Sequence, residues 1–70
     1  MFDYSKLKGR MREKGVTQEE IADSIGMNKS TLSLKLNNQF PFVQDEINEL
    51  IKILDIPADR IKEYFFIEKV

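Results

Sequence analysis

The segment Thr17–Asn38, which reads TQEEIADSIGMNKSTLSLKLNN, constrains the fold more than any other part of the chain. Thr17 and Glu20 form the pattern T-x-x-E, in which each side chain can accept a hydrogen bond from the other residue's backbone N–H. This capping box predicts that a helix begins at about Gln18. Gly26 follows where a helix end needs a residue free to adopt a positive φ. Both ends of this short helix are therefore encoded locally.

A second helix follows almost at once. Asn28 is a good N-cap, and it predicts a helix from about Lys29 to Leu36. Met27 lies between the two helices, where it can fill the angle between them. About three residues separate the helices, which is the turn length of a helix-turn-helix.

The second helix has two different faces on a wheel of 100° per residue. Leu32 and Leu36 share one face, which we expect to point into the core. The other face carries Ser30, Ser33, Leu34 and Asn37. Small hydroxyl and amide side chains let a helix approach a DNA duplex closely and still offer donors and acceptors, and Leu34 can contact a thymine methyl group. The alternative interpretation is a solvated helix face with one exposed leucine.

The segment Thr17–Asn38 closely resembles the helix-turn-helix of the lambda-repressor-like family, which includes the phage repressors and Cro proteins. The resemblance covers nearly the whole chain, since that family also has one helix before the motif and two after it. It implies an all-α, five-helix DNA-binding domain. A short extended segment can follow the fifth helix at the C-terminus.

The resemblance also implies which residues contact DNA. By position, the residues expected to read bases are Lys29, Ser30, Ser33 and Leu34. The residues expected to bind phosphates are Gln18 and Asn37, with Thr31 and Asn38 as weaker candidates.

The chain departs from the family at two positions beneath this surface. Many members pair an Arg on the first helix with a Glu just past the recognition helix, whereas this chain has Met11 and Leu36 there. Replacing a buried ion pair by an apolar pair is often neutral or stabilising, so we expect the fold to persist. Lys35 stands where an apolar residue is common, and we expect its stem to cover the core while its ammonium reaches out toward a phosphate.

A first helix is expected from about Tyr4 to Lys14, with Asp3 as its cap and Leu7 and Met11 facing inward. Its outer face is basic, with Lys6, Lys8, Arg10, Arg12 and Lys14. Such a run is usually a solvated charged face. The alternative is phosphate contact, for which Lys6 and Arg10 are our candidates, because the first helix of this family lies near the DNA backbone.

Two further helices are expected after the motif. Residues 39–43 form a loop, since Pro41 disfavours helix for the residue before it, and we expect Phe40 and Phe42 to enter the core. An apolar stripe predicts a fourth helix from about Asp45 to Leu54, and Pro57 suits the first position of a fifth helix.

The last seven residues, YFFIEKV, are strongly apolar. One small domain cannot readily bury Phe66, Ile67 and Val70 together. The tail either folds back over the first and last helices or forms a subunit interface, through a short strand or by packing of the fifth helices. A two-fold homodimer would place two recognition helices about 34 Å apart, which matches a palindromic operator.

Composition excludes several classes of protein. At 70 residues the chain has room for one modest core, so we expect a single domain over residues 1–70. It contains no Cys and no His, and no glycine-rich phosphate loop or nucleophile motif, so we expect no cofactor, no metal site and no enzyme activity. No apolar run approaches the ~20 residues of a membrane span, and nothing resembles a signal peptide. The expected location is the cytoplasm.

Charge is divided unevenly along the chain. Residues 1–43 carry seven Lys or Arg against five Asp or Glu, whereas residues 44–70 carry four against seven. The basic half suits a surface that faces phosphates, and the acidic half suits a surface that faces away from them.

The function predicted from the sequence is sequence-specific transcriptional regulation. We expect a Cro-like phage or prophage repressor that acts by operator occupancy and lacks a separate C-terminal oligomerisation and self-cleavage domain. The alternative is a protein-interaction module, such as an antirepressor or antitoxin, that retains the helix-turn-helix fold.

Overall fold

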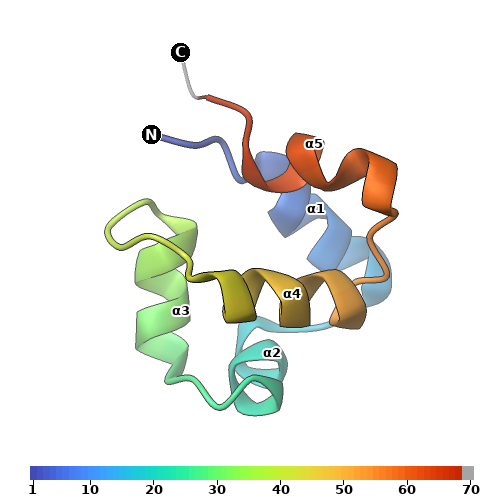
Figure 1. Cartoon of the computed structure of the whole chain (residues 1–70). Helices are drawn as coiled ribbons and strands as arrows, with labels where there is room; N and C mark the ends of the chain where they lie inside the picture. Colours follow the sequence, from blue (N-terminus) through green and yellow to red (C-terminus); the bar gives the residue numbers. More distant parts are fainter. Residues whose placement is uncertain (69–70) are drawn as a thin grey trace.

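Five α-helices and one 3₁₀ turn form the protein in a computed structural model, which describes residues 1–68 (Figure 1). They are α1 (Ser5–Lys14), α2 (Gln18–Ser24), α3 (Lys29–Leu36), α4 (Gln44–Ile53), the 3₁₀ turn Ala58–Arg60 and α5 (Ile61–Phe65). The predicted all-α, five-helix fold is confirmed. Within residues 1–68, no helix is long and apolar enough to cross a bilayer, and no group of three Cys, His, Asp or Glu side chains could hold a metal ion.

The predicted caps of α2 and α3 are present. The Thr17 hydroxyl accepts from the Glu20 N–H at 3.1 Å, and the Glu20 carboxylate accepts from the Thr17 N–H at 2.9 Å. Gly26 adopts a φ of 69°, so a side chain would be strained there. Asn28 caps α3 by accepting from the Ser30 N–H at 2.8 Å. The predicted starts of α2 at Gln18 and of α3 at Lys29 are confirmed, and α2 ends shortly before Gly26.

The start of α1 is one residue later than predicted, at Ser5. The N-cap position is occupied by Tyr4, whose side chain makes no capping bond, so the prediction that Asp3 is the cap is wrong. The Asp3 carboxylate instead accepts from both the backbone N–H and the hydroxyl of Ser5, at 2.9 and 2.6 Å. Gly15, with a φ of 68°, ends the helix as the sequence suggested.

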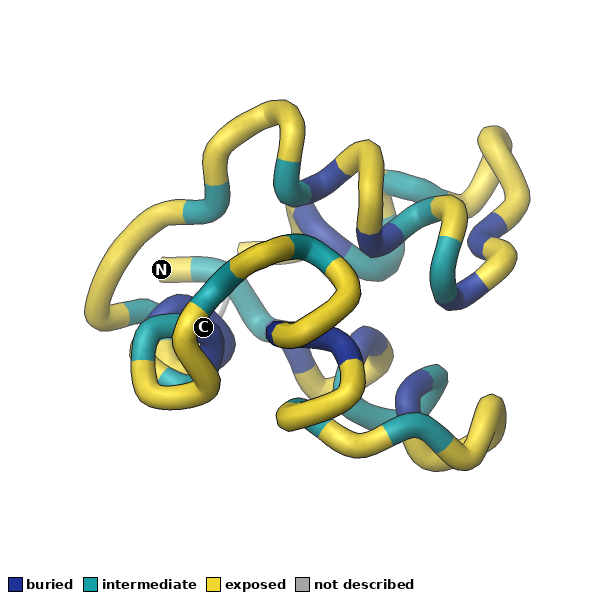
Figure 2. The backbone as a smooth tube through the Cα atoms, turned by 90° about the horizontal axis from the view of Figure 1, so that it is seen from below, coloured by how far each residue is buried: buried dark blue, intermediate teal, exposed yellow. Residues whose placement is uncertain are grey.

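The core lies where the helices meet. In Figure 2 buried and exposed stretches alternate along the helices, as expected when each helix turns one side inward. Met11 and Leu36, the apolar residues at the family's ion-pair positions, are both buried in this core. Burial raises the pKa of the Tyr4 phenol. The buried apolar side chains are Tyr4, Leu7, Met11, Ile21, Ala22, Leu32, Leu36, Ile47, Leu50, Leu54, Ile56 and Phe65.

Only one of the two phenylalanines in the loop after α3 enters the core. Phe42 packs edge-on against Tyr4 and Phe65, with ring centroids 5.4 and 6.3 Å away. Phe40 stays outside the core with 56% of its surface exposed. The prediction that Phe40 is buried is therefore wrong.

The fifth helix begins later than predicted. Pro57 has an extended ψ of 142°, so it precedes the helical segment instead of opening it. The N–H of Arg60 binds the Pro57 carbonyl at 3.0 Å, which closes a 3₁₀ turn before α5 begins at Ile61.

The N-terminal segment and the segment that leads to residue 68 lie side by side (Figure 1). Phe2 and Glu68 form an isolated antiparallel bridge, and the Asp3 N–H donates to the Ile67 carbonyl at 2.8 Å. The predicted extended C-terminal segment is present through residue 68. The tail folds back as far as an edge-on contact between the Phe66 and Phe2 rings, yet Phe66 and Ile67 remain exposed. Our expectation for Val70 lies outside the described residues.

Candidate nucleic-acid interface

The helix pair α2 and α3 forms a compact unit whose buried side fixes its orientation. Ile21 and Ala22 of α2 and Leu32 of α3 are almost fully buried in the common core. The turn between the helices is closed by a bond of 2.8 Å from the Met27 N–H to the Ala22 carbonyl. Met27 is half-buried against the core, as expected for a residue that fills the angle between the helices.

The residues predicted to read bases occupy one surface. Lys29, Ser30 and Leu34 are exposed, Ser33 is half-exposed, and all four line a shallow, open depression together with Gln18 at the start of α2. Hydroxyl, amide and ammonium groups therefore surround one apolar side chain. This combination can donate and accept hydrogen bonds at base edges and contact a methyl group.

Three of the predicted phosphate-binding residues are at least partly accessible on α2 and α3. Gln18 is half-exposed at the first position of α2, Thr31 is half-exposed, and Asn37 is exposed at the end of α3. The Asn37 side-chain oxygen accepts from the Lys8 ammonium at 3.4 Å, which brings α1 to the edge of the motif.

Two cations on α1 that we did not single out from the sequence border the motif. Lys8 and Arg12 line a second depression together with Gln18. Arg12 is exposed and makes no ion pair within residues 1–68, so its guanidinium is available to a phosphate. The sequence contains a signal that could have identified these two cations. Lys8 directly follows the inward residue Leu7 and Arg12 directly follows the inward residue Met11, so a helical wheel places both cations on the same side of the buried stripe.

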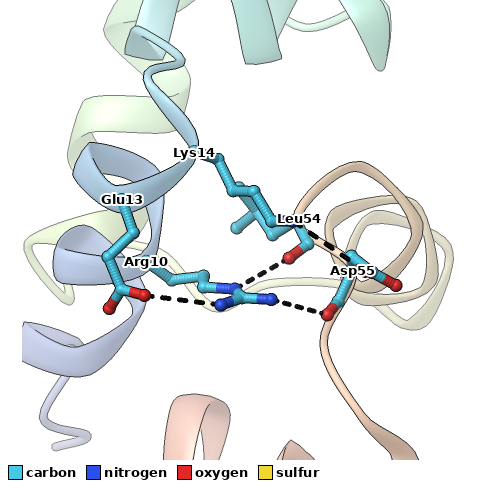
Figure 3. Close-up of polar contacts among 5 residues, drawn as sticks. All are labelled: Arg10, Glu13, Lys14, Leu54 and Asp55. Carbon is cyan, nitrogen blue, oxygen red and sulfur yellow. Dashed lines mark hydrogen bonds and ion pairs between the residues drawn. The ribbon is translucent and has the colours of Figure 1, made fainter.

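Arg10, one of our candidates for phosphate contact, is instead bound inside the domain (Figure 3). Its Nε donates to the Leu54 carbonyl and its Nη2 to the Asp55 carbonyl, both at 2.9 Å, while its Nη1 lies 3.4 Å from the Glu13 carboxylate. The guanidinium thus satisfies carbonyls at the end of α4 that the helix leaves unpaired. We correct its role to structural.

Lys6, the other candidate, also lies apart from the motif. Its ammonium is 3.4 Å from the Glu63 carboxylate on α5, in an exposed ion pair. Lys6 therefore belongs to the side of α1 that faces α5, whereas Lys8 and Arg12 belong to the side that faces Gln18.

Asn38, predicted as a weaker phosphate ligand, holds the N-terminal segment. Its side-chain oxygen accepts from the Phe2 N–H at 2.9 Å, and its side-chain amide donates to the Phe2 carbonyl at 2.6 Å. The residue has a φ of 63°, a conformation that asparagine tolerates better than most residues. Because both polar atoms are used within the domain, we remove Asn38 from the DNA-contacting set.

Lys35 does not reach outward as predicted. Its ammonium lies 2.5 and 2.6 Å from the two carboxylate oxygens of Glu46, and 11% of its side chain is exposed. The Glu46 carboxylate also accepts from the Val43 N–H at 3.0 Å. In these apolar surroundings, the nearby Glu46 carboxylate stabilises the Lys35 ammonium better than a distant phosphate could. This ion pair links the last turn of α3 to the first turn of α4.

Replacing Arg10 with Ala is expected to lower the free energy of unfolding by about 1–3 kcal/mol, because two charge-assisted bonds to carbonyls at the end of α4 are lost. Urea denaturation measures this change. Lys14→Ala is the matched control, since Lys14 makes only a 3.8 Å pair with the exposed side chain of Asp55. An Arg10→Ala protein of normal stability but reduced DNA affinity would contradict the structural role.

The chain was also compared with known proteins. The family described as "Protein of unknown function (DUF739)" matches residues 1–68, which is nearly the whole chain. No curated protein matches the sequence.

Proposed function

We propose that this chain, which belongs to the DUF739 family, is a transcriptional regulator that binds double-stranded DNA in a sequence-specific manner. The observation that carries the proposal is the exposed face of α3, where Lys29, Ser30, Ser33 and Leu34 gather beside Gln18. The two capped helices and the buried side of the pair hold that face in a fixed orientation.

In the proposed complex, α3 lies in the major groove, whose width of about 12 Å admits one helix. Lys29, at the first turn of α3, donates to guanine acceptors, and the two serines bind base edges or phosphates. Leu34 contacts a thymine methyl group. Gln18 and Asn37 bind phosphates on either side, and Lys8 and Arg12 extend the phosphate contact along α1.

The proposed regulation is repression by occupancy, as in a Cro-like phage or prophage repressor. A protein that covers a promoter prevents polymerase from binding and needs no chemical step of its own. Two copies on a palindromic operator would place their recognition helices about one DNA turn apart, at roughly 34 Å. We place this activity in the cytoplasm.

Binding to mixed-sequence duplexes over a salt series tests the phosphate contacts. Replacing Arg12 or Lys8 with Ala is expected to weaken binding uniformly across sequences and to reduce the slope of log K against log salt by about 1 each, because each cation releases one condensed counterion. Lys62→Ala is the control, since Lys62 is exposed on α5.

The control protein should keep the slope of the unsubstituted chain. An Arg12→Ala protein with an unchanged slope would contradict the contact on α1. A chain that binds no duplex at low salt would contradict the proposed function as a whole.

The second candidate function, a protein-interaction module, is favoured by one observation. Phe40, Phe66 and Ile67 leave apolar surface exposed outside the helix-turn-helix face. Substituting Lys29, Ser33 and Asn37 together separates the two functions. The triple variant loses duplex binding if the DNA proposal is correct, and it keeps its protein partner if the alternative is correct.

A further inference from the structure

An apolar pocket lies at the end of α3, away from the residues that face DNA. It has a volume of about 280 Å³ and is formed by the N-terminal residues, the loop after α3 and the end of α5. Phe2, Tyr4, Phe42 and Phe65 form its aromatic wall. A cavity of roughly 150 Å³ is known to hold benzene, so this one has room for an additional aromatic ring.

Three exposed apolar side chains line the pocket, namely Met1, Phe40 and Phe66, which are 73%, 56% and 46% exposed. Ile67, which follows Phe66 in the sequence, is 42% exposed. Among the described residues, none of the side chains that line the pocket is charged. The N-terminal ammonium and the Glu68 carboxylate pair with each other at 3.2 Å. This surface suits an apolar protein partner rather than a nucleic acid.

We infer that the partner on this surface is a second copy of the chain, with Phe40 of each copy inserted into the pocket of the other. A two-fold interface must be self-complementary, and here one surface carries both a projecting ring and a pocket that can receive a ring. Phe40 is itself one of the residues that line the pocket. A two-fold axis that passes beside Phe40 would therefore bring the ring of each copy to the pocket of the other.

The position of the surface suits a dimer on DNA, and this step rests on the proposed function. A recognition helix must lie roughly 17 Å from the two-fold axis, which is half the distance between half-sites. The eight residues of α3 span about 12 Å, and Phe40 is four residues beyond its last residue. Asn38 at the start of the loop bonds to Phe2, and Phe2 bridges to Glu68, so the loop lies next to both described ends of the chain and this axis is within reach of α3.

The exposed area indicates how strong the contact is. Large apolar side chains present about 150–250 Å² each, so four that are about half exposed offer roughly 400 Å² per copy. This is about half of the ~800 Å² per partner in a standard interface. The dimer is therefore weak and concentration-dependent in free solution, and an operator that binds both copies strengthens it.

Sedimentation velocity of the full chain between about 1 and 500 µM tests the inference. The unsubstituted protein is expected to shift reversibly from monomer to dimer over this range. Phe40→Lys is expected to weaken dimerisation at least tenfold without loss of folding, since Phe40 is outside the core. Leu34→Lys is the matched control, because Leu34 is an exposed apolar residue on the DNA-facing side, and its dimerisation should be unchanged.

Duplex binding separates this inference from the proposed function. With a single half-site, Phe40→Lys should bind like the unsubstituted chain, whereas with a full palindrome it should lose cooperativity. A chain that binds DNA but is monomeric at every concentration, and whose Phe40→Lys variant binds the palindrome normally, overturns the inference and leaves the proposed function standing. A chain that dimerises through Phe40 but binds no duplex supports the inference and overturns the proposed function.

Discussion

Replacing Lys29 with Glu is expected to weaken binding to operator DNA by at least about 100-fold, because one good base contact contributes roughly 1–3 kcal/mol and the new carboxylate is repelled by the phosphates. Lys29 is exposed at the first position of α3, in the depression that it shares with Gln18, Ser30, Ser33 and Leu34. Fluorescence anisotropy with a labelled duplex at fixed salt measures the loss.

Lys62→Glu provides a control with the same change of charge. Lys62 is exposed on α5, and neither lysine makes an ion pair in the part of the chain that the structure describes. The control protein is expected to bind within about threefold of the unsubstituted chain, as a general charge effect is small at moderate salt. Equal losses in the two variants would show that binding depends on net charge and not on the face of α3.

Replacing Glu46 with Ala is expected to lower the free energy of unfolding by about 3–5 kcal/mol, because the Lys35 ammonium would stay buried without its carboxylate. A domain of 70 residues has only about 5 kcal/mol of stability to lose, so much of the protein should unfold at room temperature. Circular dichroism during urea denaturation measures the change.

The double variant Lys35→Met with Glu46→Leu distinguishes loss of the ion pair from loss of packing. It replaces both charges by apolar groups of similar volume, which is often neutral or stabilising. Most of the stability lost in Glu46→Ala should therefore return, apart from the bond that Glu46 accepts from the Val43 N–H. A double variant as unstable as Glu46→Ala would contradict the explanation by an unpaired buried charge.

The helices of the motif could be predicted from the sequence because their determinants are local. Thr17 and Glu20 bond to each other three residues apart, and Asn28 caps α3 through a residue two positions away. Gly26 ends α2 through its own backbone conformation, and its N–H bonds to the carbonyl of Asp23 only three residues before it. Each of these signals lies inside a window of a few residues.

The polar side chains that hold α3 to the rest of the domain could not be predicted in this way. Lys35 pairs with Glu46, Asn38 with Phe2, and Arg10 with the end of α4. These partners are 11, 36 and 44 residues apart in the sequence, and periodicity on one helix contains no information about a partner on another. We therefore interpreted three internal contacts as DNA contacts.

The exposed face of α3 was easier to predict from the sequence than the side of α1 that borders the motif. The burial of Leu32 and Leu36 leaves only one side of α3 for the polar residues, so the face followed from the wheel. On α1, charges lie on both sides of the buried stripe, and the sequence does not say which side meets α2. The structure places Lys8 and Arg12 beside Gln18, whereas Lys6 pairs with Glu63 on α5 and Arg10 bonds to the end of α4.

The internal contacts have a consequence for recognition. The Lys35–Glu46 pair fixes α3 against α4, and the Asn38–Phe2 bonds fix the end of α3 against the paired termini. Because Phe40 is two residues after Asn38, the proposed dimer contact and the proposed DNA contact are joined by only a few residues. Dimerisation and operator binding should therefore reinforce each other through α3.

The most direct test of DNA recognition by α3 is selection of random duplexes with the purified protein, followed by sequencing. The proposed function predicts enrichment of a palindrome whose half-sites are centred about 10–11 base pairs apart. Lys29→Glu should remove that enrichment, and Lys62→Glu should preserve it. No enrichment by the unsubstituted chain, even at low salt, would contradict the assignment of this protein as a sequence-specific DNA-binding regulator.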